Sequence, residues 1–103
     1  MKYVVSWTFR SYGSAADNEA APKRILELYT KWTPPAGMKI HHFLGSIAAS
    51  GGYMVLETDN PTDLADTISK FAPYADYRVE PVLDVAEAVQ VARESIEFRD
   101  SIG

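Results

Sequence analysis

Two adjacent residues, His41 and His42, are the only histidines of the chain. An imidazole has an unperturbed pKa of about 6.5, so it suits proton transfer at neutral pH. Successive residues of a strand point to opposite faces, so we do not expect this pair to bind one metal ion. We expect His42 to be a general base, because it shares a strand face with Ile40 and Leu44. The alternative is a surface histidine without a catalytic role.

A charged pair, Arg78 and Glu80, alternates with Tyr77 and Val79 along another predicted strand. If the apolar pair packs beneath helices, the charged pair faces the other side of the sheet. There Arg78 can bind a carboxylate or an enolate, and Glu80 can orient that group or act as a base. An exposed ion pair on an edge strand, or a contact across a dimer, is the alternative interpretation.

Four bulky side chains are candidates for lining a pocket that accepts an aromatic ring: Tyr3, Trp7, Phe9 and Met54. Ordinary core or interface packing is the alternative for such a stripe. The chain has no glycine loop for phosphate, no GxSxG elbow, no HExxH and no EF-hand spacing. We therefore expect no P-loop enzyme, serine hydrolase or zinc protease, and no cofactor or metal.

The pattern of apolar residues predicts strands that alternate with helices. In residues 2–10, Tyr3, Val5, Trp7 and Phe9 share one face of a strand. A helix is predicted from about Asp17 to Trp32 by one apolar stripe of Ala21, Ile25, Leu28, Tyr29 and Trp32. Its start is placed near Asp17 or Asn18 because Pro22 is tolerable only in a first turn. The further predicted elements are strands at 38–47, 53–58 and 77–82, a helix at 61–71 and a helix from 84 onward, with a fraying tail at 97–103.

Turn and cap residues mark the boundaries of these elements. Ser50-Gly51-Gly52 is expected to supply the positive φ angles of a tight hairpin turn. Asn60 is expected to cap the helix in which Pro61 takes the first position. Asp84 and Glu87 resemble a capping box, and Pro81 indicates an edge strand or a strand end.

The order β-α-β-β-α-β predicts a ferredoxin-like α+β fold with a four-stranded antiparallel sheet, followed by a C-terminal helix. At 103 residues we expect one domain over 1–103. Both faces of the first strand carry apolar residues, and its bulky face should not remain exposed. We therefore expect a homodimer that stacks two sheets into a closed barrel.

Composition excludes several classes of partner. The chain is 47% hydrophobic and 23% charged, with no apolar run of the ~20 residues that a membrane span needs. A net charge of −4 argues against nucleic acid and against anionic membranes. The absence of cysteine excludes disulfides and thiolate catalysis. Strand pattern from the first residues, without a signal segment, favours a cytoplasmic location.

Three segments resemble a family of short bacterial proteins classed as a domain of unknown function. They are Met54-Val-Leu-Glu-Thr-Asp-Asn-Pro61, Val79-Glu-Pro-Val-Leu83 and Glu87-Ala88. Pro35-Ala36-Gly37-Met38 occupies the turn that precedes the second strand in that family. The chain departs from the family pattern at 71–75, where a tryptophan and Asp-Leu are replaced, and at Trp7, where an acidic residue is expected.

More broadly, the pattern resembles the dimeric α/β-barrel superfamily. That group includes cofactor-free monooxygenases, polyketide cyclases, lactone isomerases, and dehalogenating and haem-acting enzymes. The resemblance implies a pocket inside a barrel, although a fold does not determine a function.

Together these features suggest a homodimer, paired through its sheet faces, that binds a small and partly apolar molecule. Any catalysis would be cofactor-free proton transfer in an isomerase, cyclase or monooxygenase type of reaction. His42 would be the base and Arg78 with Glu80 would stabilise negative charge, while Tyr3 and Trp7 would shape the pocket. The alternative is a non-catalytic ligand-binding or dimerisation module.

Overall fold

The computed structural model describes residues 1–11 and 13–103. Seven elements follow one another in the predicted order β-α-β-β-α-β-α: β1 (Lys2–Phe9), α1 (Ala15–Lys31), β2 (Lys39–Gly45), β3 (Gly51–Glu57), α2 (Pro61–Phe71), β4 (Ala75–Val82) and α3 (Val85–Ile102). Within these described residues, no helix has the length and apolar character needed to cross a membrane.

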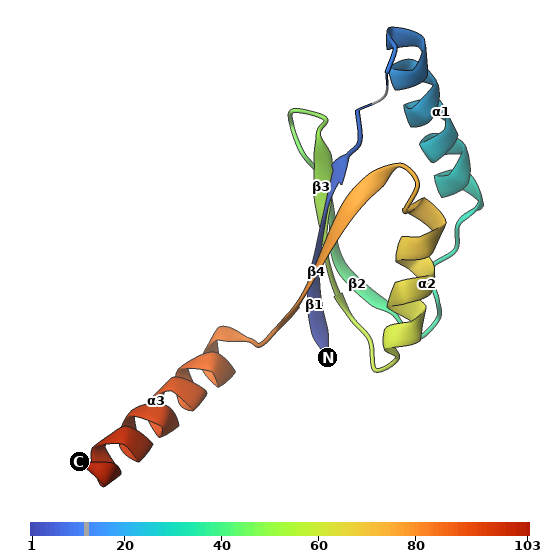
Figure 1. The fold of residues 1–103 in the computed structure, drawn as a ribbon. Helices are drawn as coiled ribbons and strands as arrows, with labels where there is room; N and C mark the ends of the chain where they lie inside the picture. Colours follow the sequence, from blue (N-terminus) through green and yellow to red (C-terminus); the bar gives the residue numbers. More distant parts are fainter. Residues whose placement is uncertain (12) are drawn as a thin grey trace.

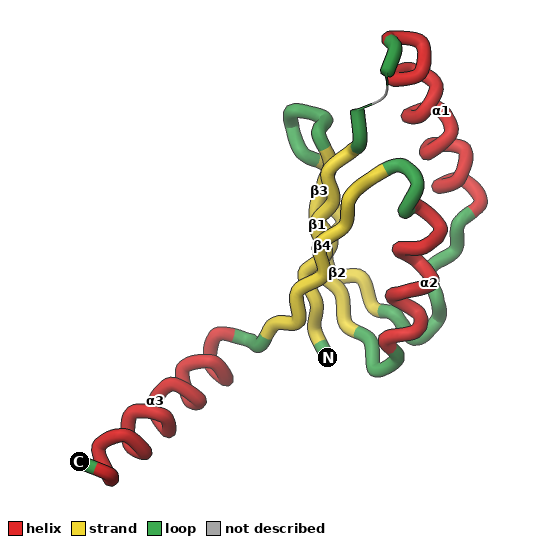
Figure 2. Tube along the Cα trace, in the orientation of Figure 1, coloured by secondary structure: helices red, strands yellow, loops and turns green. Residues whose placement is uncertain are grey.

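The four strands form one antiparallel sheet in the order β2-β3-β1-β4. Helices α1 and α2 cover one face of this sheet, and within the described residues no helix or strand covers the other face (Figures 1 and 2). We call the uncovered side the open face. The topology confirms the ferredoxin-like prediction, and the edge position of β4 agrees with Pro81.

The core lies between the sheet and the two helices. Val5 and Leu56 are fully buried there, and Trp7 and Met54 are only 8% and 5% exposed to solvent. The bulky face of β1 was correctly grouped, but the helices of the same chain cover it. That face therefore does not require a second sheet, and the prediction of a dimer loses this argument.

Helix α2 begins as its sequence predicts. The Asn60 side-chain oxygen accepts a hydrogen bond from the Thr62 backbone N–H at 3.1 Å, and Pro61 takes the first position, where no N–H is needed. Leu64 and Phe71 are buried on its inner face.

Helix α1 begins earlier than predicted, and the reason is its cap. Ser14 Oγ accepts a hydrogen bond from the Asp17 backbone N–H at 3.1 Å, so the helix starts at Ala15. Pro22 then lies within the helix rather than in its first turn, and the prediction was wrong on this point. Because proline has no N–H, the ladder lacks the bond that would otherwise run to the Asn18 carbonyl.

The β2–β3 hairpin uses its glycines differently from the prediction. The left-handed φ angles belong to Ala49 (57°) and Gly51 (155°), and Gly52 does not share them. Gly52 instead allows close packing, since a Cβ there would collide with the indole of Trp7 and the carbonyl of Leu44.

Helix α3 also differs from its predicted form. Asp84 is the N-cap residue, but its side chain makes no capping hydrogen bond and instead accepts one from Lys2 Nζ at 2.6 Å. This hydrogen bond lowers the pKa of Asp84 and raises that of Lys2. The helix continues to Ile102, so the expected fraying from residue 97 was wrong.

A glycine pair across the hairpin provides a matched test of the packing. Gly52→Ala should destabilise the protein by at least about 2 kcal/mol, because the new methyl group displaces Trp7. Gly45 pairs with Gly52, and a Cβ there meets nothing within 4 Å. Gly45→Ala should therefore be neutral or stabilising by about 0.5 kcal/mol. Urea unfolding measures both, and equal losses would contradict this account.

Candidate functional site

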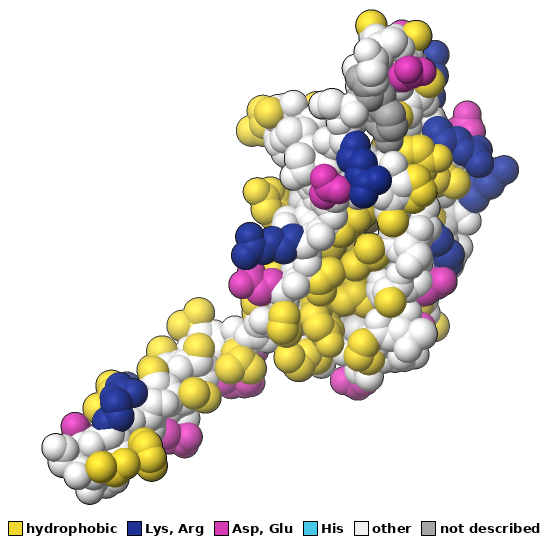
Figure 3. All heavy atoms as spheres, in the orientation of Figure 1, with side chains coloured by type: hydrophobic (Ala, Val, Ile, Leu, Met, Phe, Trp, Pro, Cys, Tyr) yellow, Lys and Arg dark blue, Asp and Glu magenta, His cyan; other side chains and the backbone are white. Residues whose placement is uncertain are grey.

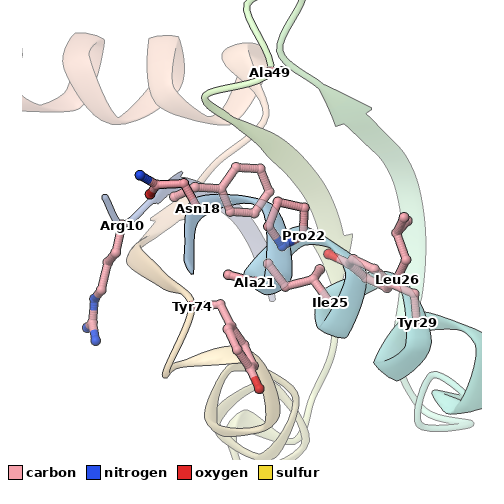
Figure 4. A pocket seen from close by; sticks show the side chains of 10 residues that line it. Arg10, Asn18, Ala21, Pro22, Ile25, Leu26, Tyr29, Ala49 and Tyr74 are labelled. Carbon is pink, nitrogen blue, oxygen red and sulfur yellow. The ribbon is translucent and has the colours of Figure 1, made fainter. Parts of the chain in front are cut away.

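A hollow lies where β1 ends and the N-terminal half of α1 stands beside the sheet (Figure 4). Its volume is about 440 Å³, within the usual range for small-molecule sites. The described residues that line it come from β1, α1, the β2–β3 turn and the segment before β4: Phe9, Arg10, Asn18, Ala21, Pro22, Ile25, Leu26, Tyr29, Ala49 and Tyr74.

The hollow exists because α1 packs tightly over only part of its length. Ile25 is the one residue described as buried in this helix, and Leu26 is 65% exposed. Ala21, Ile25 and Tyr29 share the face that is turned to the hollow (Figure 4). The apolar stripe of α1 therefore divides: Trp32 packs against the core, whereas Ala21 and Ile25 border the open cavity.

An aromatic cluster lies next to the hollow, between the sheet and the helices. It consists of Trp7, Tyr29, Trp32, Phe43, Phe71 and Tyr77. Tyr29 stacks on Phe71 with ring centroids 4.7 Å apart, and Trp7 meets Phe43 edge-on at 5.6 Å. Tyr29 borders both the hollow and a void of about 20 Å³ inside the cluster. That void is about large enough for one water molecule.

Polar groups are few in this region. Arg10 Nε donates a hydrogen bond to Asp76 Oδ1 at 2.9 Å, which neutralises much of its charge at the edge of the hollow. Asn18 places its side-chain amide at the same edge (Figure 4). Trp32 Nε1 is buried and has no hydrogen-bond partner in the described part of the chain.

Burial keeps the phenols of this region neutral. It raises the pKa of Tyr77 to about 12, with a further contribution from nearby Tyr29, and burial also raises the pKa of Tyr29. Like any tyrosine of ordinary pKa, both are neutral at pH 7, and the raised pKa extends that state to higher pH. Tyr29 borders the hollow and can donate a hydrogen bond to a molecule there, whereas Tyr77 borders only the small void.

The four residues predicted to line one pocket do not lie around a single cavity. Phe9 lines the hollow, while Trp7 and Met54 line the small void inside the aromatic cluster. Tyr3 packs against the hydrophobic core beside these residues. All four lie on the helix-covered face of the sheet, but only Phe9 borders the hollow itself.

The predicted catalytic residues lie on the other side of the sheet. His42 pairs with Val55, Val55 with Val4, and Val4 with Glu80, so this row crosses the whole sheet. His42 and Glu80 are thus three strand spacings apart, about 14 Å. Arg78 is near Glu80 on the same edge strand and is also exposed. One protomer therefore does not bring His42 to the charged pair.

A β-bulge changes the orientation of the histidines. The register of β2 shifts between Ile40 and His42, so His41 and His42 both lie on the open face. His41 Nε2 is 2.9 Å from Glu57 Oε1, and Glu57 is also 3.8 Å from Lys2 Nζ. The expected alternation of the two histidines was wrong, as was the shared face of His42 with Ile40.

Several residues of the hollow were not predicted as site residues. Asn18, Pro22 and Tyr74 carried no sequence signal for a site, because the hollow depends on how far α1 stands from the sheet. Tyr29 lay in the apolar helical stripe and was assigned to core packing. No group of three or more possible metal-ligating side chains occurs among residues 1–11 and 13–103.

Alkaline titration tests the burial of Tyr77. Because folding raises its pKa, the stabilisation from neutral Tyr77 is present below pH ~10 and is lost as pH rises through about 12. Tyr77→Phe should remove the last phase of phenolate absorbance and make stability fall less steeply between these pH values. Tyr53→Phe, at an exposed position, is the control. An unchanged last phase in Tyr77→Phe would contradict the assignment.

Comparison with known proteins places the chain in a family. Residues 1–96 match the family model of a domain of unknown function, DUF3303. No curated protein matches the chain. The crystal structure of muconolactone isomerase is similar, with a TM-score of 0.55 and 18% identity over 82% of this chain and 90% of that one. That likeness shows a shared fold. Because the family model spans nearly all of the sequence, the chain belongs to the DUF3303 family.

Proposed function

We propose that this protein binds a small, largely apolar molecule in the hollow beside α1. The observation that carries the proposal is an open cavity of about 440 Å³ whose described lining is mostly apolar, with few polar groups at its edge. Concave apolar sites with a few directed polar groups are typical of ligand pockets. The fold that the chain shares with muconolactone isomerase is compatible with such a site.

The lining favours a ligand with an apolar body and one uncharged oxygen. Phe9, Ile25 and Leu26 provide apolar contact, while Tyr29 and Asn18 provide hydrogen-bonding groups. A free carboxylate on the ligand has no unpaired cation to meet among the described lining residues, since Arg10 is paired with Asp76. A ring-sized alcohol, phenol or ketone therefore fits better than a charged acid.

We also propose that two copies pair through their open faces. The middle of this face carries Val4 and Val55, and Tyr53 and Leu44 on it remain 55% and 53% exposed. An apolar sheet face is normally covered by another layer. A second sheet stacked about 10 Å away would cover it and form the proposed barrel.

A catalytic version of the function requires this pairing. If the two-fold axis runs parallel to the strands, β2 of one copy lies over β4 of the other. His42 of one copy would then face Arg78 and Glu80 of the second copy, as a base beside a charge-stabilising pair. The observation that favours this version is that His42, Arg78 and Glu80 all lie exposed on the open face. In the non-catalytic alternative, these side chains only satisfy one another at the interface.

Filling the hollow tests the binding proposal. Ala21→Trp places an indole in the cavity and should weaken binding of 2-naphthol at least tenfold, as measured by fluorescence titration. Ala20→Trp is the matched control, because the neighbouring Ala20 is exposed and does not line the hollow. Equal affinities in the two variants would place binding elsewhere, and no binding by the wild type would remove the proposal.

Replacement of His42 distinguishes a catalytic function from binding alone. Native mass spectrometry of protein purified from its own host, followed by chromatography of the released molecule, compares His42→Ala with the wild type. If His42 is catalytic, the wild type should carry the product and His42→Ala should carry the unconverted substrate. Chromatography distinguishes the two molecules even if they are isomers of equal mass. Lys39→Ala, an exposed change on the same strand, is the control. If the wild type, His42→Ala and Lys39→Ala all carry the same molecule, the catalytic version is wrong and the protein is a binding module.

A further inference from the structure

Helix α3 is amphipathic, yet none of its residues is buried. At 100° per residue its large apolar side chains form two stripes, one of Val85, Val89 and Ile96 and one of Val91, Phe98 and Ile102, which border one half of the circumference with Arg99 between them. Their exposed fractions are high: Val85 79%, Val89 44%, Val91 53%, Ile96 50%, Phe98 65% and Ile102 71%. A single helix of this length is only marginally stable in water without packing of its apolar face.

The position of α3 explains this exposure. The helix leaves the end of β4 and points away from the rest of the protein, on the side of the open face (Figure 1). The Cα radius of gyration is consequently 18.3 Å, whereas a compact chain of this length has about 13 Å. The helix therefore lacks an intramolecular partner for its apolar side.

The connection between β4 and α3 is short and carries exposed ion pairs. Only Leu83 and Asp84 connect β4 to the helix. Lys2 Nζ holds Asp84 Oδ1 at 2.6 Å and lies 3.8 Å from Glu57, which ties the connection to β1 and β3. A return of α3 onto its own open face would require the chain to reverse its direction within these two residues.

The rest of the protein carries an uncovered apolar surface that matches α3. A band of hydrophobic side chains runs between the sheet and α2 down towards the start of α3 (Figure 3). On the helix-facing side of β4, Val79 remains 39% exposed, and Pro81 is exposed as well. Ile68 and Tyr77 are only partly buried beside them.

We propose that α3 is an arm that packs its apolar face onto the β4–α2 band of a second copy of this chain. The receiving band lies on the helix-covered side of β4, so this contact is separate from the proposed pairing through the open faces and does not depend on it. Half the lateral surface of a helix about 27 Å long is roughly 400 Å². Two exchanged arms and two receiving bands then bury roughly 1,600 Å², the size of a standard stable interface.

The charges of α3 favour a protein partner over a membrane. The helix carries more acidic than basic residues: Glu87, Glu94, Glu97 and Asp100 against Arg93 and Arg99. Helices that lie on anionic membranes are instead rich in lysine and arginine on the polar side. The second copy offers an apolar band of its own, which needs the same kind of cover.

Charge insertion on α3 tests the arm. Val89→Glu with Ile96→Glu, on the apolar side, should weaken the dimer at least a hundredfold in sedimentation velocity of the full chain. Ala86→Glu with Gln90→Glu adds the same charge on the polar side and should leave the dimer intact. Equal dimer affinities in both double variants would overturn the inference, as would a monomeric wild type.

Crosslinking tests where the arm lies, and the lack of native cysteine makes it specific. Val79→Cys with Ile96→Cys, treated with a short bismaleimide, should give covalent dimers on a denaturing gel. Val79→Cys with Gln90→Cys is the control and should give fewer. Crosslinks within single chains would show that α3 folds back, and would overturn the inference. The 2-naphthol titration on the same samples shows separately whether the hollow binds.

Discussion

The close approach of Trp7 to Gly52 is the contact on which the helix-covered side of the protein depends. The two residues pair directly between β1 and β3, and the missing Cβ of Gly52 leaves space for the indole. From this position Trp7 reaches Phe43 on β2 and Tyr77 on β4, with ring centroids 5.6 and 6.2 Å away. One side chain on a central strand thus connects all four strands of the sheet.

The same cluster determines where the hollow forms. Tyr29 stacks on Phe71 and so holds the C-terminal half of α1 against α2. The N-terminal half of α1 lies beyond the cluster and has no aromatic partner of this kind among the described residues. The helix therefore diverges from the sheet, and the open volume beside Ala21 and Ile25 results. The cavity to which we assign binding thus arises from incomplete packing next to a well-packed core.

The sheet divides the protein chemically. Aromatic and aliphatic side chains lie under the helices, and the histidines and the Arg78–Glu80 pair lie on the open face. The bulge in β2 strengthens this division, since it turns both His41 and His42 to the open side. A reaction that uses these polar groups together needs a second copy, whereas binding in the hollow needs only one chain.

The sequence alone determined the order of the elements and several of their boundaries. Local chemistry was sufficient for these features: Asn60 and Pro61 start α2, Pro81 lies on an edge strand, and strict alternation groups the apolar face of β1. Each depends on neighbouring residues, whose side chains compete with the backbone or alternate across a strand. The family motifs in the C-terminal half agreed with the family that was found.

Only the tertiary structure decided which side of the sheet each candidate residue faces and where a cavity remains. The β-bulge is a property of two paired strands, so the sequence of β2 did not reveal that His42 lies away from Ile40. The start of α1 at Ser14 moved Pro22 into the helix and beside the hollow. The apolar stripe of α3 was readable, but periodicity shows only that a helix has an apolar side. What covers that side depends on the direction in which the chain leaves β4 through the short connection at Leu83 and Asp84, and periodicity does not contain that direction.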